Sequence, residues 1–93
     1  MKKAVVTVLG KDRVGIIYNV SGILAENKVN ILDISQTIMG DIFSMVMIVD
    51  IENSVKEFDV LSDELDKKGN ELGVKITICR EDIFNAMHRI WGE

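Results

Sequence analysis

The chain has 93 residues, which is enough for one domain and too few for two. Its formal net charge of −4 argues against nucleic-acid binding, which usually leaves a basic footprint. No apolar run approaches the roughly 20 residues of a membrane span, and the start does not resemble a signal peptide, so we expect a cytoplasmic protein. Cys79 is the only cysteine and His88 the only histidine, which excludes an internal disulfide and a Cys/His metal cluster.

The N-terminal part of the sequence predicts a strand followed directly by a helix. Residues 4–9 (AVVTVL) are mostly β-branched, as is typical of a strand. From Val14 the apolar residues change to helical spacing, with one side formed by Ile16, Ile17, Val20, Ile23 and Leu24. At the corner between them, we expect Asp12 to cap the helix and Gly10 to allow the turn.

The next segment predicts a β-hairpin. Residues 31–39 and 42–51 flank Gly40-Asp41, which suits a two-residue type II′ turn. In the register that this turn sets, the pairs on one face are Ile38 with Phe43, Gln36 with Met45, Ile34 with Met47 and Leu32 with Val49. This face is almost wholly apolar, so we expect it to meet the helices, whereas the opposite face is half polar and half apolar.

A second helix and a fourth strand complete the pattern. Ser54 to Glu57 reads as a capping box that starts the helix, which ends at Gly69 or Gly73. Its apolar side is expected to contain Val55, Phe58, Leu61, Leu65 and Leu72. Residues 74–80 (VKITICR) alternate and predict a strand with Val74, Ile76 and Ile78 inward.

The order βαββαβ predicts an α+β fold, the ferredoxin-like sandwich with an antiparallel four-stranded sheet and two helices on one face. Residues 1–80 form this domain, with the strand at 31–39 on a sheet edge. Residues 81–93 form a C-terminal amphipathic helix whose apolar stripe is Ile83, Phe84, Met87, Ile90 and Trp91. Since so short a helix is marginal alone, it must dock, either on the half-apolar sheet face or on a second subunit.

The corner between the first strand and helix is the candidate binding site. Gly15 is placed in the first helical turn, where glycine costs up to about 1 kcal/mol relative to alanine. Its missing side chain leaves the first-turn N–H groups open to a carboxylate or phosphate. Arg13 adds a charge-assisted contact or points into water.

With these elements in order, the chain resembles an ACT domain. The residues that carry the resemblance are "DRVGI" at Asp12 to Ile16 and "NILDI" at Asn30 to Ile34, and it covers about residues 3–80. It looks closest to the small stand-alone ACT proteins related to the glycine-cleavage repressor type. The resemblance implies a regulatory module that binds a small ligand, commonly an amino acid, at an interface between subunits.

Carried over by position, the resemblance implies a ligand site shared by two chains. One chain contributes the corner, with Asp12, Arg13, Val14, Gly15 and Ile16, and the other contributes Asn30, Ile31, Leu32 and Asp33. Family members often have proline where this chain has Val14, which loosens the turn slightly. We therefore expect a homo-oligomer, most simply a homodimer, without cofactor, metal or catalytic residues. The apolar edge "NILDIS" fits this expectation, because an exposed edge strand can pair with a copy of itself.

Three other functions compete with this interpretation. The first is a protein–protein adaptor that binds no ligand. The second is an acylphosphatase-like hydrolase, a fold with the same element order, in which Arg13 would hold phosphate and Asn30 would position water. Against it, the corner lacks that family's longer loop and Asn30 is expected to precede the strand.

The third alternative is an RNA-binding ferredoxin-like module, which needs exposed aromatic residues on the central strands for base stacking. The first strand has none, and Phe43 is expected on the face that the helices cover. The sequence also shows no nucleophile–base pair, phosphate-binding loop or metal-ligand spacing, so we expect no enzyme activity.

Overall fold

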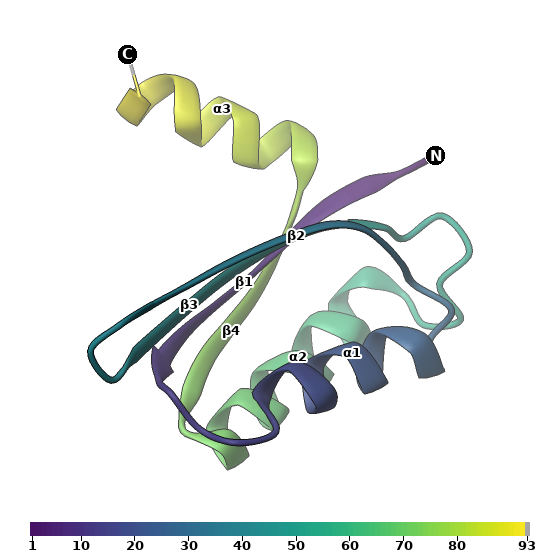
Figure 1. Ribbon diagram of the computed structural model, residues 1–93. Helices are drawn as coiled ribbons and strands as arrows, with labels where there is room; N and C mark the ends of the chain where they lie inside the picture. Colours follow the sequence, from purple (N-terminus) through teal and green to yellow (C-terminus); the bar gives the residue numbers. More distant parts are fainter. Residues whose placement is uncertain (93) are drawn as a thin grey trace.

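The computed structural model describes residues 1–92, with side chains up to residue 86. The elements are β1 (Lys3–Lys11), α1 (Ile16–Glu26), β2 (Asn30–Met39), β3 (Ile42–Asp50), α2 (Phe58–Leu72), β4 (Val74–Arg80) and α3 (Glu81–Gly92). This order confirms the predicted βαββαβ pattern with one added helix (Figure 1).

The four strands form one antiparallel sheet in the order β2-β3-β1-β4. Helices α1 and α2 lie on one face of the sheet, and α3 lies on the other (Figure 1). This is the ferredoxin-like sandwich that the sequence predicts, with β2 at one edge and β4 at the other.

The core lies between the sheet and the α1/α2 layer. It is formed by alternate residues of three strands, which are Ala4, Val6 and Val8 in β1, Phe43, Met45, Met47 and Val49 in β3, and Val74, Ile76 and Ile78 in β4. The helices contribute the residues that recur every three or four positions, among them Val20, Leu24, Leu61 and Leu65. Each fully buried side chain of this size stabilises the fold by about 1.5–3 kcal/mol relative to exposure.

The β2–β3 hairpin has the predicted turn and most of the predicted register. Gly40 has φ 64°, and Asp41 has no positive φ, as a type II′ turn requires. The pairs from Ile38 with Phe43 down to Ile34 with Met47 are confirmed. The predicted pair of Leu32 with Val49 is wrong, because a β-bulge after Ile31 shifts the register and Val49 pairs with Ile31.

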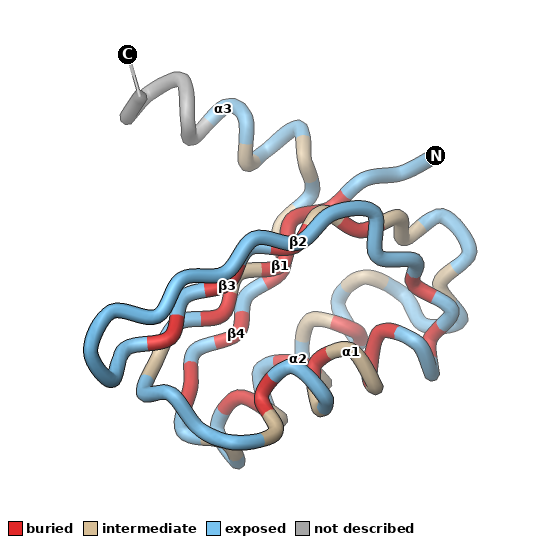
Figure 2. The backbone as a smooth tube through the Cα atoms, viewed as in Figure 1, coloured by how far each residue is buried: buried red, intermediate tan, exposed pale blue. Residues whose placement is uncertain are grey.

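The expectation that the helices cover the inner face of β2 is also wrong. All ten residues of β2 are exposed, and Figure 2 shows the strand as one continuous exposed edge. Ile34 and Ile38 keep 43% and 51% of their surface exposed. The two helices α1 and α2 cover β3, β1 and β4, and the edge strand β2 lies beyond them.

Both helices on the core face begin later than the sequence suggests. α1 begins at Ile16 rather than at Val14, and α2 begins at Phe58, four residues after Ser54. The Ser54 hydroxyl donates to the Lys56 carbonyl and accepts from the Lys56 N–H, so it closes a local turn instead of capping α2. The C-terminus of α2 is predicted correctly, at Gly73 in a left-handed conformation.

Helix α3 begins beside its own sheet, and the docking of its apolar stripe stays a prediction. It contacts β1 and β4 on the face opposite α1 and α2. Val5, which points to that face, is only 1% exposed, as expected beneath a covering element. The side chains of Met87, His88, Ile90 and Trp91 lie outside the described part. None of the helices in residues 1–92 is long and apolar enough to cross a membrane.

Candidate functional site

The corner between β1 and α1 depends on the backbone conformation of Gly15. This residue is the N-cap of α1, with φ 93° and ψ 0°, and not part of the first helical turn as predicted. Residues with a side chain rarely adopt that backbone conformation, so the backbone favours glycine here. Space does not require it, since a Cβ atom would lie 3.4 Å from Asn19 Nδ2, an ordinary contact. The amide Nδ2 of Asn19 donates to the Gly15 carbonyl at 2.7 Å and fixes the corner to the helix.

The prediction that Asp12 caps α1 is wrong. No side chain accepts a hydrogen bond from the first turn of α1, and that turn contains no acidic residue. Asp12 instead donates its backbone N–H to the Asp41 carbonyl at 2.7 Å, which ties the corner to the hairpin turn. The first-turn N–H groups thus keep their capacity to bind an anion at the positive end of the helix.

Arg13 does not simply extend into water. Its guanidinium lies against Gly73 at the end of α2, where a Cβ atom would come within 3.2 Å of Nη2. The carbonyl end of a helix attracts a cation, which gives this position a physical reason. Val14, in contrast, is fully exposed and leaves the corner open at its tip.

A pocket of about 240 Å³ lies between the corner and the β2–β3 hairpin. Ile16 and Phe43 are buried beneath it, while Ile38 and Tyr18 are exposed at its rim. The rest of the lining is Asp12, Arg13, Gly15, Ile17 and Gln36. Its volume falls below the roughly 300–1,000 Å³ of typical ligand pockets, so one chain presents an incomplete site.

Sequence reasoning found the corner half of this pocket and missed the hairpin half. Gln36 carried a usable signal. It is the one polar residue on the hairpin face that was expected to be apolar, between Ile34 and Ile38. Tyr18 carried none. It is 81% exposed and lies off the apolar side of α1, and only the fold places it beside the hairpin.

The second predicted group, Asn30 to Asp33, lies far from the corner in the same chain. Asn30 pairs with Asp50 at one end of the hairpin, whereas Ile38 lines the pocket at the other end. Eight residues of strand separate them, which is about 26 Å. Asn30 is also the first residue of β2 and does not precede the strand as expected. A single chain therefore does not bring the two groups together.

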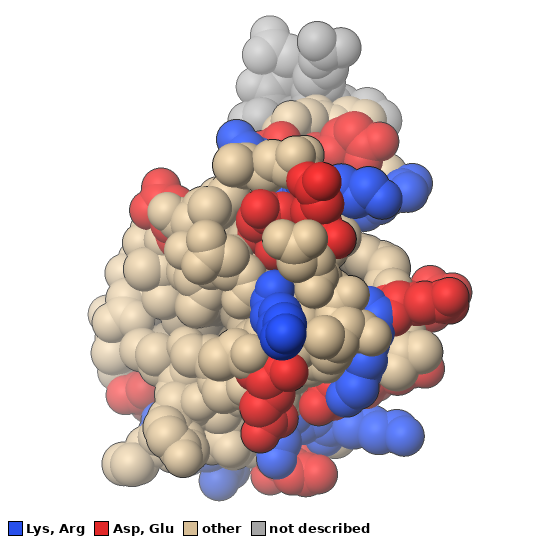
Figure 3. All heavy atoms as spheres, turned by 90° about the vertical axis from the view of Figure 1, so that its right-hand side faces the viewer, with Lys and Arg blue, Asp and Glu red and all other residues tan. Residues whose placement is uncertain are grey.

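The same geometry bears on two of the alternative functions. Arg13 and Asn30 lie at opposite ends of the sheet, so one chain does not converge them on a phosphate as a hydrolase would need. Phe43 is 3% exposed, which removes it from base stacking. Acidic and basic side chains are interspersed on the face shown in Figure 3. Among the described residues, no group of three or more His, Cys, Asp or Glu side chains is placed to hold a metal ion.

The fold and the pocket define a ferredoxin-like α+β domain with a small pocket at its first strand–helix corner. The family model described as "ACT domain" matches residues 2–78, and the chain belongs to the ACT domain family. This confirms the resemblance that the corner and second-strand motifs indicated.

Several known proteins are similar to this chain. A UPF0237 protein of Clostridium acetobutylicum is 59% identical over 88 residues, which is 95% of this chain and 99% of the relative. The structure of an ACT domain protein from Streptococcus pneumoniae is 42% identical with a TM-score of 0.78, covering 89% of this chain and 93% of that one. A putative glycine cleavage system transcriptional repressor shares the fold, with 22% identity and a TM-score of 0.69, over 85% of this chain and 45% of that one.

Proposed function

We propose that this protein is a regulatory homodimer that binds a small ligand, of the amino-acid class, at the interface between its two copies. The corner of one copy, Asp12 to Ile16, and the start of β2 in the other, Asn30 to Asp33, form the site. Binding shifts the population between dimer arrangements, and a partner senses that shift.

The observation that carries this proposal is the separation of the two residue groups along β2. If two copies pair antiparallel through their β2 edges with the two-fold axis near Ile34, the partner's Asn30 comes opposite Ile38. The partner's Asn30 to Asp33 segment then lies beside the corner pocket. In each chain the segment Asn30 to Asp33 is too far from its own corner pocket, so the same segment of the partner closes that pocket.

The chemistry of the corner favours a carboxylate-bearing ligand. The first turn of α1 offers N–H groups that no side chain occupies, and it lies at the positive end of the helix dipole. The Asp33 carboxylate does not take part in the site, because Asp33 pairs with Ile48 and lies on the face of the sheet opposite α1 and α2. Its Oδ1 accepts the N–H of Ile34 at 2.8 Å.

The assembly is tested with a variant that places like charges at the two-fold axis. We expect the wild-type chain to sediment as a dimer and Ile34→Lys to sediment as a monomer, because the two introduced ammonium groups would face each other. Val60→Lys is the matched control, since Val60 is a similarly exposed apolar residue on α2, away from β2. A wild-type chain that stays monomeric up to about 1 mM would overturn the dimer interface.

The ligand is tested by thermal unfolding of the wild-type chain with each of the common amino acids. At a concentration about 100 times its Kd, a ligand adds about 2.7 kcal/mol of stability, which raises Tm by several degrees. Ile34→Lys should lose this response and Val60→Lys should keep it. A dimer that responds to no amino acid would support the ligand-free adaptor instead.

A further inference from the structure

A second pocket lies at the end of the sheet opposite the corner. It has a volume of about 400 Å³, within the range of typical small-molecule sites. Four segments surround it, which are the start of β1, the residue after β3, the first residue of α2 and the β4–α3 junction. None of its lining residues belongs to the site proposed above.

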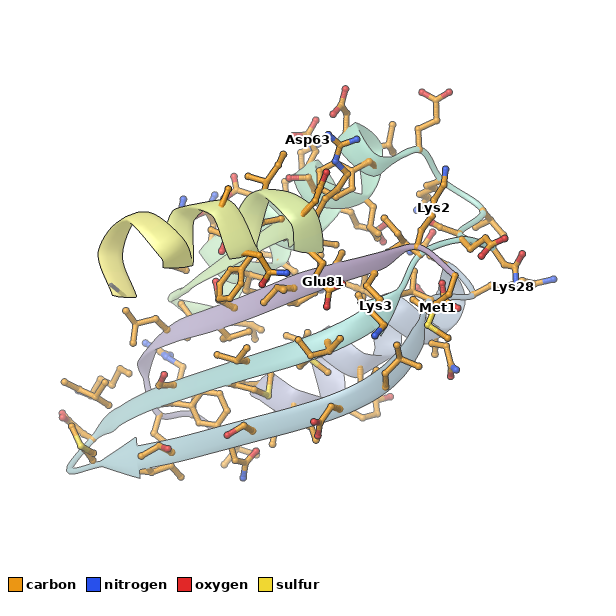
Figure 4. All side chains as sticks on the ribbon, turned by 90° about the horizontal axis from the view of Figure 1, so that it is seen from above. Met1, Lys2, Lys3, Lys28, Asp63 and Glu81 are labelled. Atoms are coloured by element: carbon orange, nitrogen blue, oxygen red, sulfur yellow. The ribbon has the colours of Figure 1, made fainter. Side chains whose placement is uncertain are left out.

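The cationic residues of this pocket are mounted on a fixed backbone. The Lys2 N–H donates to Asp50 Oδ1 at 3.3 Å, and the Lys2 carbonyl accepts from the Ile51 N–H at 2.8 Å. Lys3 begins β1, and Arg80 ends β4 opposite Ala4. Figure 4 shows Lys2 and Lys3 at the same end of the molecule as Glu81, the first residue of α3. Because the backbone is paired, ligand binding has to order only the side chains.

The charges of the pocket are only partly balanced. Arg80 Nε lies 3.9 Å from Asp82 Oδ1, which is a long ion pair, and this is the one ion pair among the lining side chains that the described residues show. The side-chain ammonium groups of Lys2 and Lys3 make no hydrogen bond and no ion pair with any of the described residues. Three cations therefore face two carboxylates in a chain whose net charge is −4. An anion gains charge-assisted hydrogen bonds here.

The inner wall of the pocket is apolar. Ile51 and Phe58 are half-buried and pack against the core cluster. Each leaves part of its surface facing the pocket, and covering that surface is favourable by about 25 cal/mol per Å². A bare inorganic ion would leave this wall in contact with water.

We propose that this pocket binds a small organic carboxylate, with its charged group toward Lys2, Lys3 and Arg80 and its apolar body against Ile51 and Phe58. The site also acts on α3. Arg80 and Glu81 are the last residue of β4 and the first residue of α3, with no loop between them. A ligand that contacts both sides of this joint restrains the direction in which α3 leaves the sheet.

The test uses the chain from Met1 without an N-terminal tag, because the α-ammonium of Met1 pairs with Glu52 close to Lys2. The probes are 3-phenylpropionate, 3-phenylpropylamine with the same apolar body and the opposite charge, and inorganic phosphate. We expect 3-phenylpropionate to shift the backbone amide resonances of Lys3, Ile51, Phe58 and Arg80 saturably. The amine should not bind, and phosphate should bind at least about tenfold more weakly because it has no apolar body.

Two double variants assign the binding to this pocket. Lys3→Gln with Arg80→Gln should weaken 3-phenylpropionate at least about tenfold, since it removes two charge-assisted contacts. Lys67→Gln with Lys75→Gln removes the same charge from exposed positions elsewhere and should leave the affinity unchanged. The single variant Lys3→Gln repeats the test if the double variant does not fold.

The effect on α3 is read from Trp91, the only tryptophan of the chain and a residue of that helix. Its fluorescence should change along the same titration curve as the amide shifts. The pocket proposal is overturned by the absence of saturable shifts, by equal binding of the amine, by full affinity in Lys3→Gln with Arg80→Gln, or by shifts confined to Asp12 to Ile16. Since Ile34→Lys does not touch this pocket, that variant should still bind 3-phenylpropionate even if the dimer proposal fails.

Discussion

Strands β2 and β3 belong to one hairpin and have similar apolar alternation, yet they have opposite environments. Met47 in β3 is completely buried, whereas Ile34, its direct partner in β2, keeps 43% of its surface exposed. The difference comes from position in the sheet, because β3 lies between β2 and β1 while β2 has a free edge. An apolar face in a strand thus shows which side chains can be buried, and the layer above the sheet decides which of them are.

The exposed strand retains features that limit uncontrolled pairing. The bulge after Ile31 interrupts the regular ladder, and Asp33 places a charge beside it. Natural sheets use both devices to restrict edge-to-edge aggregation. A strand that is open along its whole length but irregular at one end suits one defined partner better than many.

The largest expected effect is the difference in stability cost between truncating Met47 and truncating its cross-strand partner Ile34. Met47→Ala should lower the free energy of unfolding by about 2–5 kcal/mol, because it leaves a cavity in the core. Ile34→Ala should cost less than about 1 kcal/mol in the monomer, since much of its side chain already contacts water. Urea unfolding at a concentration where the chain is monomeric measures both. Equal costs for the two variants would mean that β2 is covered in solution.

The glycines of the two core helices also differ in their surroundings. Gly69 is buried in α2, and an added Cβ would lie 2.7 Å from the Val74 carbonyl oxygen. Gly69→Ala should therefore destabilise the protein by about 1–3 kcal/mol, because helix and strand must separate. Thermal or urea unfolding measures the change. A neutral result would show that the α2–β4 contact is looser than described.

Gly22 in α1 is the matched position on the open side. A Cβ atom there would meet nothing within 4 Å. Gly22→Ala should therefore stabilise the protein by about 0.5–1 kcal/mol, since alanine restricts the unfolded chain and favours helix. A loss of stability in the same unfolding assay would indicate that a partner segment approaches this face closely.

The smallest expected effect concerns a partly exposed ion pair between the loop before α2 and α2 itself. Lys56 Nζ lies 2.6 Å from Glu64 Oε1, which also accepts a hydrogen bond from Asn27, and the hydrogen bond from Lys56 holds the pKa of Glu64 below its usual range. Because the folded pKa is the lower one, this stabilisation is present above the unfolded pKa of about 4.3 and disappears as the pH falls through the folded value. The partial exposure of both side chains limits it to about 0.5 kcal/mol.

Glu64→Gln keeps the shape and removes the charge. It should be less stable than wild type near pH 7, and the difference should be smaller near pH 3, because more of the wild-type chain has Glu64 protonated there. Chemical unfolding at the two pH values measures the difference. A constant difference at both values would mean that the glutamate acts through packing and not through its charge.

The sequence by itself determined the order of the elements, the hairpin turn and the buried residues of β3 and β4. Val74, Ile76 and Ile78 alternate because a strand exposes its two faces in turn, and Gly40 occupies the turn position that needs a positive φ. The family followed from the corner and second-strand motifs for the same reason, since those signals lie within short stretches of chain.

Only the tertiary structure decided the environment of each face. Leu32 loses its predicted pairing at the bulge after Ile31. Gly15 instead of Asp12 is the N-cap of α1, and the Asp12 N–H bonds the hairpin turn at Asp41. Each of the two pockets, the corner pocket and the pocket at the opposite end of the sheet, is lined by residues that are distant in sequence. Local patterns fix backbone conformation, whereas burial and sites depend on which segments the packed fold places next to one another.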